Sequence, residues 1–217
     1  ETLKQAVDYA HIFGVKINNM NMNETVNAVK DLLKLNRPSL IFTPNSEILY
    51  LAKNDDEFKA ILNSSDINTA DGIGVVYAAK ILNTPIPERV AGYDLSRELL
   101  KVMNESKLKL FLFGGKPGVA DIAAQKINEE YPDINICGTE NGYFDSSDKI
   151  IEHINEKNPD FLFVCLGAPK QEKWIYENKD KLNCKVMMGI GGSLDVYANV
   201  AKRAPEFFIK LNIEWLY

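Results

Sequence analysis

Short runs of consecutive apolar residues alternate along the chain with longer segments whose apolar residues recur at helical spacing. The run from Phe161 to Leu166 is apolar at every position, which is typical of a strand covered on both faces. We expect strands at residues 12–17, 39–43, 66–69, 109–113, 135–138, 161–166 and 185–189. We expect helices at residues 24–35, 46–53, 56–63, 74–82, 93–103, 118–130, 147–156, 170–178 and 205–217.

This alternation predicts an α/β fold, a single Rossmann-like domain over residues 1–217 with a mainly parallel sheet flanked by helices. A chain of 217 residues is long enough to bury one substantial core. No repeat or low-complexity linker divides it, and the two prolines within residues 83–89 fit an ordered loop. Ligands of open parallel sheets bind beyond the carboxyl ends of the strands, so the strand-to-helix junctions are the places to look for chemistry.

The composition narrows the class of protein. The 46% hydrophobic and 25% charged residues are typical of an ordinary globular protein, and the net charge of −5 argues against nucleic-acid binding. The three cysteines form no CxxC pair, so the sequence indicates neither a zinc knuckle nor a redox dithiol. No stretch approaches the ~20 apolar residues of a membrane span, and no signal peptide opens the chain. The chain stops within an apolar helical pattern at Tyr217, so we expect a C-terminal segment to be missing.

Polar residues follow two of the expected strands. Thr43 and Asn45 flank Pro44 and present short hydrogen-bonding groups at the sheet edge. The same pattern also fits a helix cap formed by Asn45. Asp71 ends another strand and precedes Gly72, so its carboxylate can project into a cleft or can cap the next helix.

Basic residues mark two further junctions. Arg89 lies in a loop without a partner at helical spacing, where a substrate diphosphate could pair with it. The turn Gly114-Gly115-Lys116 follows a buried strand, and its backbone N–H groups and the lysine charge can bind phosphate. These glycines could equally serve only tight packing between the strand and the following helix.

The junction after residue 166 contains Lys170 and Gln171 in the first turn of an expected helix. A lysine in this position opposes the helix dipole unless an anion is bound, which indicates a ligand site. Motifs for other chemistries are missing. Gly72 and Gly74 do not complete a GxGxxG motif, because Tyr77 stands at its sixth position, and the chain has no P-loop, HExxH, GxSxG or Asp-x-Asp sequence. We therefore expect no protein-held metal and no cofactor, and the residues do not support a nicotinamide-dependent oxidoreductase.

Over nearly its whole length the chain resembles the WecG/TagA/CpsF family of bacterial glycosyltransferases, most closely the teichoic-acid branch. The resemblance is carried by several motifs in the same order. They are Phe13-Gly-Val15, Thr43-Pro-Asn45, Ala70-Asp-Gly-Ile-Gly74, Glu88-Arg-Val-Ala-Gly-Tyr-Asp94, Phe113-Gly-Gly-Lys-Pro-Gly118, Asn141-Gly-Tyr-Phe144, Leu166-Gly-Ala-Pro-Lys-Gln-Glu-Lys-Trp174, Lys202-Arg-Ala-Pro205 and Glu214-Trp-Leu-Tyr217. The turn at residues 189–195 departs from the usual family sequence.

The resemblance implies an inverting enzyme of wall teichoic acid linkage-unit synthesis. It would move N-acetylmannosamine from UDP-N-acetylmannosamine to undecaprenyl-diphosphate-linked N-acetylglucosamine. It also implies Asp71 as general base, with Thr43, Asn45, Arg89 and Gln171 as active-site partners. Family members work peripherally at the inner, cytoplasmic face of the cell membrane and carry a basic C-terminal tail, which we expect this chain to lack.

Three alternatives stay open from the sequence. A related family member could use UDP-N-acetylmannosaminuronic acid or UDP-glucose, because donor choice depends on the shape of the pocket. The chain could instead be a non-catalytic module that binds a nucleotide sugar. The apolar stripe at residues 207–216 could pack in the core, face the membrane or form a homo-oligomer.

Overall fold

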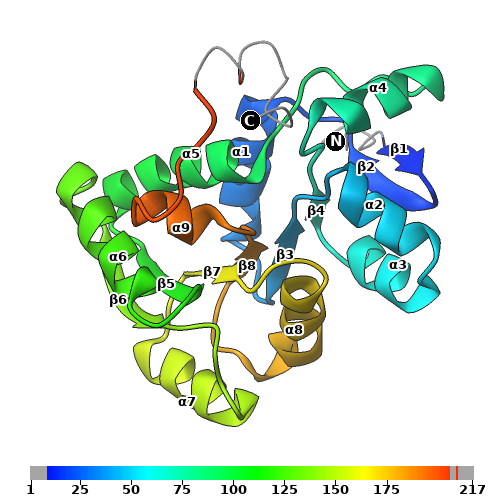
Figure 1. The fold of residues 1–217 in the computed structure, drawn as a ribbon. Coiled ribbons are helices and arrows are strands. Elements are labelled where there is room, and N and C mark those ends of the chain that lie inside the picture. The colour runs from blue at the N-terminus through cyan, green and yellow to red at the C-terminus, as the bar shows by residue number, and fades with distance from the viewer. Residues whose placement is uncertain (1–8, 206–208, 210–217) are drawn as a thin grey trace.

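The computed structural model describes residues 9–205 and Ile209. Its centre is a six-stranded sheet in the order β4-β3-β8-β7-β5-β6, and every neighbouring pair is parallel (Figure 1). The strands are β3 (Ser39–Phe42), β4 (Ile67–Asn68), β5 (Lys109–Gly114), β6 (Asn135–Glu140), β7 (Phe161–Cys165) and β8 (Val186–Gly189). The predicted α/β fold with a mainly parallel sheet is confirmed.

Strand residues alternate between two hydrophobic cores, one on each face of this sheet. In β5, Leu110 and Leu112 join one core, whereas Phe111 and Phe113 join the other. Every residue of β7 is buried, which explains why its sequence is apolar at each position instead of alternating.

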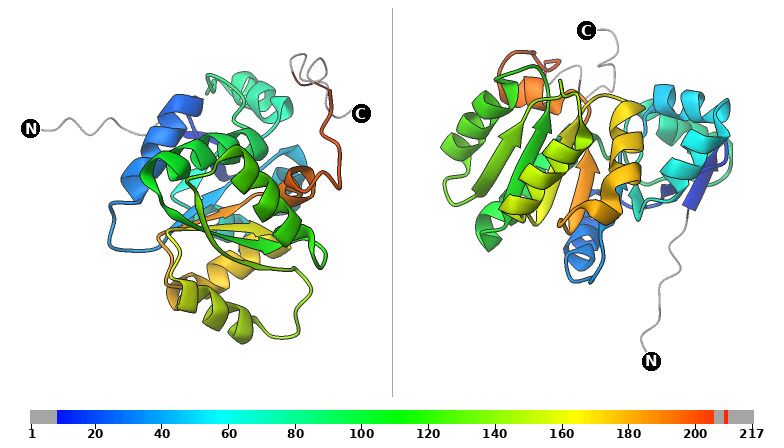
Figure 2. Two further views of the ribbon diagram at one scale, coloured as in Figure 1. Left: turned by 90° about the vertical axis from the view of Figure 1, so that its left-hand side faces the viewer. Right: turned by 90° about the horizontal axis from the view of Figure 1, so that it is seen from below.

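Helices cover both faces of the sheet (Figures 1 and 2). The core on one face includes residues of α1 (Met22–Leu32), α5 (Gly92–Ser106), α6 (Val119–Glu130) and α9 (Ser193–Tyr197). The core on the other face includes residues of α2 (Ser46–Lys53), α3 (Asp56–Asn63), α4 (Ile73–Ile81), α7 (Ser147–Lys157) and α8 (Lys170–Asn178). A 3₁₀ turn at Lys179–Lys181 follows α8. Within the described residues, no helix is long and apolar enough to cross a bilayer.

The prediction of one strand at residues 12–17 is wrong. The segment forms an antiparallel hairpin of β1 (Tyr9–Ile12) and β2 (Val15–Asn18), which is a separate two-stranded sheet. Phe13 and Gly14 both have positive φ angles, of 51° and 82°, and a two-residue turn of this kind reverses the chain within an apparently continuous strand.

Two other differences concern the end of the chain. The short helix α9 was not expected, because five residues give no helical period to detect. The expected helix at 205–217 and its apolar stripe lie outside the described residues, apart from Pro205 and Ile209.

Side-chain amides attach the hairpin to the sheet. The buried Asn68 Nδ2 donates to the carbonyl oxygens of Lys16 (3.0 Å) and Leu62 (2.8 Å), and its backbone N–H donates to Asn18 Oδ1 at 2.8 Å. Asn63 Nδ2 donates to the carbonyl of Gly14 at 2.9 Å. Buried carbonyl groups need such donors, since leaving one unsatisfied costs about 1–3 kcal/mol.

The substitution Asn68→Ala should destabilise the protein by about 1–3 kcal/mol, because the carbonyl groups of Lys16 and Leu62 each lose a hydrogen bond from the buried amide. Urea denaturation followed by circular dichroism measures the change. Asn27→Ala, on the exposed face of α1, is the matched control and should stay within about 0.5 kcal/mol. Equal midpoints for the two variants would show that the amide network does not hold the hairpin.

Candidate active site

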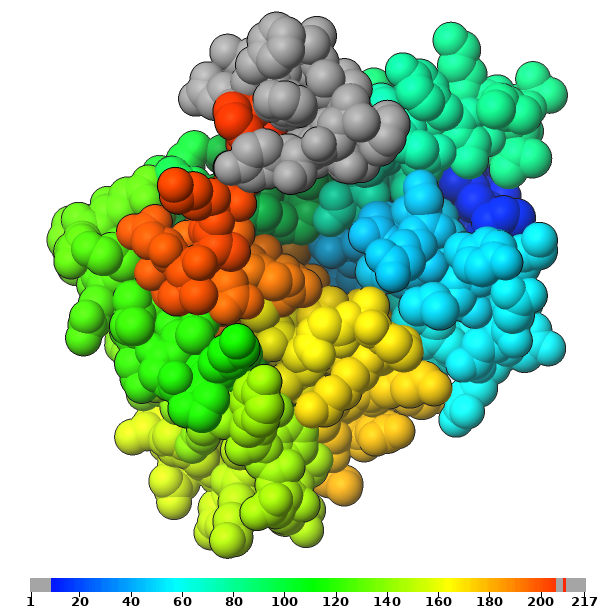
Figure 3. All heavy atoms as spheres, in the orientation of Figure 1, coloured from blue at the N-terminus to red at the C-terminus, as the bar shows by residue number. Residues whose placement is uncertain are grey.

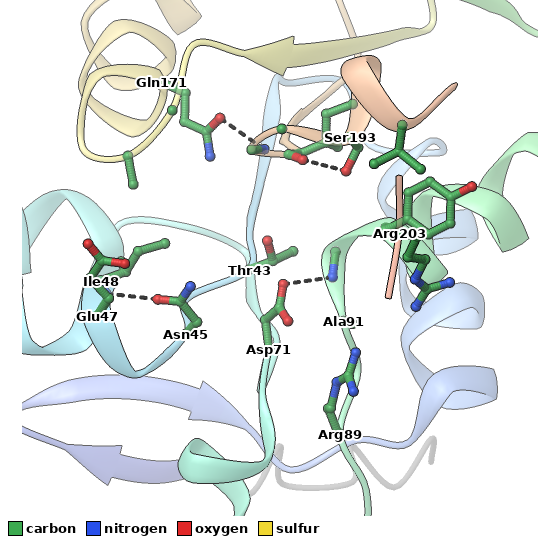
Figure 4. Close-up of a pocket in the computed structure, with 18 of the residues that line it drawn as sticks. Thr43, Asn45, Glu47, Ile48, Asp71, Arg89, Ala91, Gln171, Ser193 and Arg203 are labelled. Carbon is green, nitrogen blue, oxygen red and sulfur yellow. Dashed lines mark hydrogen bonds between the residues drawn. The ribbon is translucent and has the colours of Figure 1, made fainter. Parts of the chain in front are cut away.

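A cavity of about 520 Å³ opens beyond the carboxyl ends of β3, β4, β7 and β8. Five residues singled out from the sequence line it, from segments far apart along the chain: Thr43, Asn45, Asp71, Arg89 and Gln171. In Figure 3 the surface is hollowed between the cyan α2 region, the orange α9 region and the yellow segment after β7. Figure 4 shows the side chains around this first cavity. Its location agrees with the rule for ligand sites in parallel sheets.

Asp71 is held in the first cavity by the start of α5. Its Oδ2 accepts a hydrogen bond of 2.9 Å from the backbone N–H of Gly92 (Figure 4). The positive end of the helix dipole lies there and stabilises an ionised carboxylate. The residue at the N-cap of α4 is Gly72, so Asp71 is not the helix cap that the sequence left open as an alternative.

Gly92 allows this close approach. A β-carbon at that position would lie 2.7 Å from Thr43 Oγ1 and 3.3 Å from Asp71 Oδ2. The absence of a side chain therefore brings the first turn of α5 against both residues.

Asn45 caps a helix and also lines the first cavity. Its Oδ1 accepts from the backbone N–H of Ile48 at 2.9 Å, which makes it the N-cap of α2. It also lines the cavity beside Thr43 (Figure 4). Because Oδ1 is the capping acceptor, the Nδ2 group is the part of the amide able to donate to a ligand.

Two arginines lie beside the first cavity and share one carboxylate. Arg203 Nη2 lies 2.7 Å from Asp94 Oδ1 and 2.8 Å from Asp94 Oδ2, and its guanidinium stacks 4.6 Å from the ring centre of Tyr93. Arg89 Nη2 lies 3.9 Å from the same carboxylate. Both guanidinium groups therefore lie at the same wall of the first cavity, where they can bind an anion such as a diphosphate.

Gln171 connects α8 to the turn after β8. Its Oε1 accepts from the backbone N–H of Gly191 at 3.1 Å (Figure 4), and its side chain is buried. A β-carbon at Gly189 would approach Gln171 Nε2 to 2.9 Å, so the glycine makes room for the amide.

A second cavity, of about 770 Å³, adjoins the first and shares Gly167, Gly191 and Gly192 with it. Gly115, Lys116 and Lys170 line it, together with Tyr143, Phe144 and Asp195. A β-carbon at either Gly191 or Gly192 would meet no described atom within 4 Å. A side chain there would project into the space that joins the cavities.

Lys170 is held at the wall of the second cavity. Its Nζ lies 3.4 Å from the carbonyl oxygen of Gly142 and 4.9 Å from the ring centre of Phe144. These contacts hold the ammonium group at the wall without neutralising its charge. The ammonium group therefore stays available to an anionic ligand in the second cavity.

Gly114 differs from the other residues of its motif because it is not among the described residues that line either cavity. Its φ is +131°, and a β-carbon would lie 2.1 Å from the carbonyl oxygen of Cys165. These facts favour the packing alternative for Gly114. Gly115 and Lys116 stay predicted binding residues.

Sequence reasoning missed several residues of the first cavity, including Glu47, Ser193 and Arg203. Ser193 ends a glycine-rich turn after a buried strand, which is the signal that pointed to Gly115 and Lys116. Arg203 belongs to a matched motif, yet its ion pair with a residue 109 positions earlier could not be read from the sequence. Glu47 gave no signal, since acidic residues are common in first turns of helices.

In the described part of the chain, no group of three or more His, Cys, Asp or Glu residues is arranged to hold a metal ion. The thiol of Cys165 borders the second cavity, and burial raises its pKa to about 11. It therefore stays protonated near neutral pH and is a poor nucleophile. The charged groups suited to an anionic substrate are the arginines and lysines described above.

Comparison with known proteins agrees with this geometry. Residues 10–217 match the glycosyl transferase WecG/TagA/CpsF family. An N-acetylglucosaminyldiphosphoundecaprenol N-acetyl-beta-D-mannosaminyltransferase of Bacillus subtilis (strain 168) is 41% identical over 179 residues, which cover 82% of this chain and 70% of the relative. The protein of the same name from Staphylococcus aureus (strain MRSA252) is 37% identical over 209 residues, which cover 95% of this chain and 82% of the relative. This chain belongs to the WecG/TagA/CpsF family of glycosyl transferases.

Proposed function

We propose that this protein transfers N-acetylmannosamine from UDP-N-acetylmannosamine to undecaprenyl-diphosphate-linked N-acetylglucosamine, in synthesis of the wall teichoic acid linkage unit. The names of the two relatives contain this acceptor and this sugar. The observation that carries the proposal is the carboxylate of Asp71, fixed by the N-terminus of α5 in a cavity beside Thr43, Asn45, Arg89 and Gln171.

The reaction is a single displacement that inverts the anomeric carbon. The acceptor's 4-hydroxyl oxygen forms a bond to that carbon as the bond from the carbon to the UDP oxygen breaks. Asp71 takes the proton of the attacking hydroxyl, and UDP leaves with the bonding electron pair. The hydrogen bond from Gly92 N–H holds the carboxylate of Asp71 in the cavity, where it can accept this proton.

The departing UDP gains negative charge, which basic side chains can stabilise in place of a metal ion. Arg89 and Arg203 border the first cavity, and Lys116 and Lys170 border the second. The opening at Gly191 and Gly192 lets one ligand extend through both. We infer that the sugar lies near Asp71 and that the nucleotide extends toward the two lysines.

The acceptor's polyprenyl chain resides in a membrane, so the protein must work at a membrane surface. We propose peripheral binding at the cytoplasmic face of the membrane.

Asp71→Asn should lower the rate of sugar transfer by ~10²–10⁴-fold, because an amide cannot accept the proton. UDP affinity, measured by calorimetry, should change less than about threefold, because Asp71 acts on the acceptor. Asp133→Asn, an exposed carboxylate on another surface, should leave both quantities unchanged. A parallel loss of transfer and of UDP affinity for Asp71→Asn would indicate a structural role.

Lys170→Met should weaken UDP binding about tenfold through loss of a charge-assisted contact. The single-turnover rate at saturating donor should fall as well, because the same charge stabilises the negative charge that develops on departing UDP. Lys173→Met is the control, since Lys173 lies on the same helix and pairs with Asp55 at 3.6 Å. Equal UDP affinities for the two variants would place the nucleotide elsewhere.

Removal of metal ions should leave the activity intact. We would measure UDP release from UDP-N-acetylmannosamine with and without a lipid-diphosphate N-acetylglucosamine analogue, in excess EDTA. The assay uses the chain of residues 1–217. Acceptor-dependent release supports the proposal, and release only from another UDP-sugar would keep the reaction but change the donor. Loss of release in EDTA, restored by a divalent ion, would contradict metal independence.

A further inference from the structure

A buried carboxyl group next to the first cavity has no evident structural purpose. Glu172, in the first turn of α8, is 1% exposed. Its Oε1 accepts from Gln171 Nε2 at 2.8 Å, whereas its Oε2 is buried without a hydrogen-bond partner among the described residues. Burial raises the pKa of this carboxyl. An unsatisfied buried oxygen of this kind costs about 1–3 kcal/mol of stability.

The requirements of the helix do not explain this burial. A carboxylate in a first turn interacts favourably with the helix dipole, but a solvated one gains the same benefit without desolvation. Asn68 Oδ1 is also buried without a partner among the described residues, but its Nδ2 group donates to two backbone carbonyl groups and so attaches the hairpin to the sheet. The carboxyl of Glu172 instead accepts from another side chain, that of Gln171, which lines the cavity.

The neighbours of Gln171 permit one orientation of its amide. Gly191 N–H is a donor, so the amide oxygen must face it, at 3.1 Å. Glu172 Oε1 is an acceptor, so the amide nitrogen must face the carboxyl. If either neighbour were missing, rotation of the amide by 180° would exchange a donor for an acceptor at the cavity wall.

We propose that Glu172 is a positioning residue, which fixes the amide of Gln171 so that its second N–H donates to an oxygen of the bound substrate. This inference rests on the proposed function, in which Gln171 contacts the nucleotide sugar. The same hydrogen-bond chain runs from Glu172 through Gln171 to Gly191, so it also sets the turn between the two cavities. The unsatisfied oxygen of Glu172 is the stability cost of this arrangement.

Two substitutions distinguish a positioning role of Glu172 from a purely structural role. Glu172→Met keeps the approximate volume but removes the acceptor, and its melting temperature should equal or exceed that of the wild type. Its kcat for sugar transfer should fall about 10–100-fold, because the amide of Gln171 is no longer held in one orientation. Glu172→Gln retains an acceptor oxygen for Gln171 Nε2 and should restore kcat to within about threefold of wild type.

Asn178→Ala provides the matched control on the same helix. Asn178 is also buried and donates to the carbonyl of Trp174 at 2.8 Å, but it is not among the described residues that line either cavity. This variant should have a lower melting temperature and an unchanged kcat. A positioning role predicts opposite behaviour of the two variants. Asn178→Ala should lose stability but keep its kcat, whereas Glu172→Met should keep its stability but lose kcat.

Three results would overturn the inference. These are wild-type kcat in Glu172→Met, a joint loss of stability and kcat in that variant, or a Glu172→Gln variant as inactive as Glu172→Met. A second readout does not depend on catalysis: the side-chain amide signals of Gln171 in ¹⁵N-labelled protein should shift in Glu172→Met and broaden as the amide rotates. If the wild-type protein transfers no sugar, the proposed function is wrong. If the Gln171 amide signals are unchanged in Glu172→Met, the positioning role of Glu172 is wrong, whatever the activity.

Discussion

Parallel pairing in the central sheet places the carboxyl ends of all six strands at one edge, and the cavity walls depend on this constraint. The chain returns to the opposite edge before each new strand, so the segments that meet at the site are distant in sequence. Residues 43–45, 71, 167–171 and 190–193 come together in this way. Because the ladder satisfies the backbone of the strands internally, the loops beyond it are free to adopt conformations suited to ligands.

Much of this arrangement follows from local sequence patterns, and the exceptions have physical causes. Fully apolar runs identified the buried strands, and the strand-end rule led to Asp71 and Gln171. The hairpin was missed because its turn depends on left-handed conformations at Phe13 and Gly14, inside a run of strand-forming residues. Long-range contacts were also inaccessible: the partnership of Arg203 with Asp94 and the burial of Glu172 depend on packing that a helix-period pattern does not encode.

The buried polar groups next to the hairpin differ in role from those next to the cavities. Asn63 and Asn68 supply donors to backbone carbonyl groups of the hairpin, whose apolar residues also join the core on one face of the sheet. The pair formed by Gln171 and Glu172 satisfies mainly itself and the turn after β8. In the network of Asn63 and Asn68, local sequence preference agrees with the packing of the fold. In the pair of Gln171 and Glu172 the two conflict, and conflicts of that kind concentrate at functional sites.

The first turn of α5 contacts the groups to which the proposed reaction assigns proton transfer and charge stabilisation. Gly92 N–H binds the carboxylate of Asp71, and two residues later Asp94 pairs with Arg203 and approaches Arg89. A small displacement of this helix would therefore alter the contacts of Asp71 and of both arginines at the same time. Under the proposed mechanism, the position of one helix thus affects both the proton acceptor and the cations that face the leaving group.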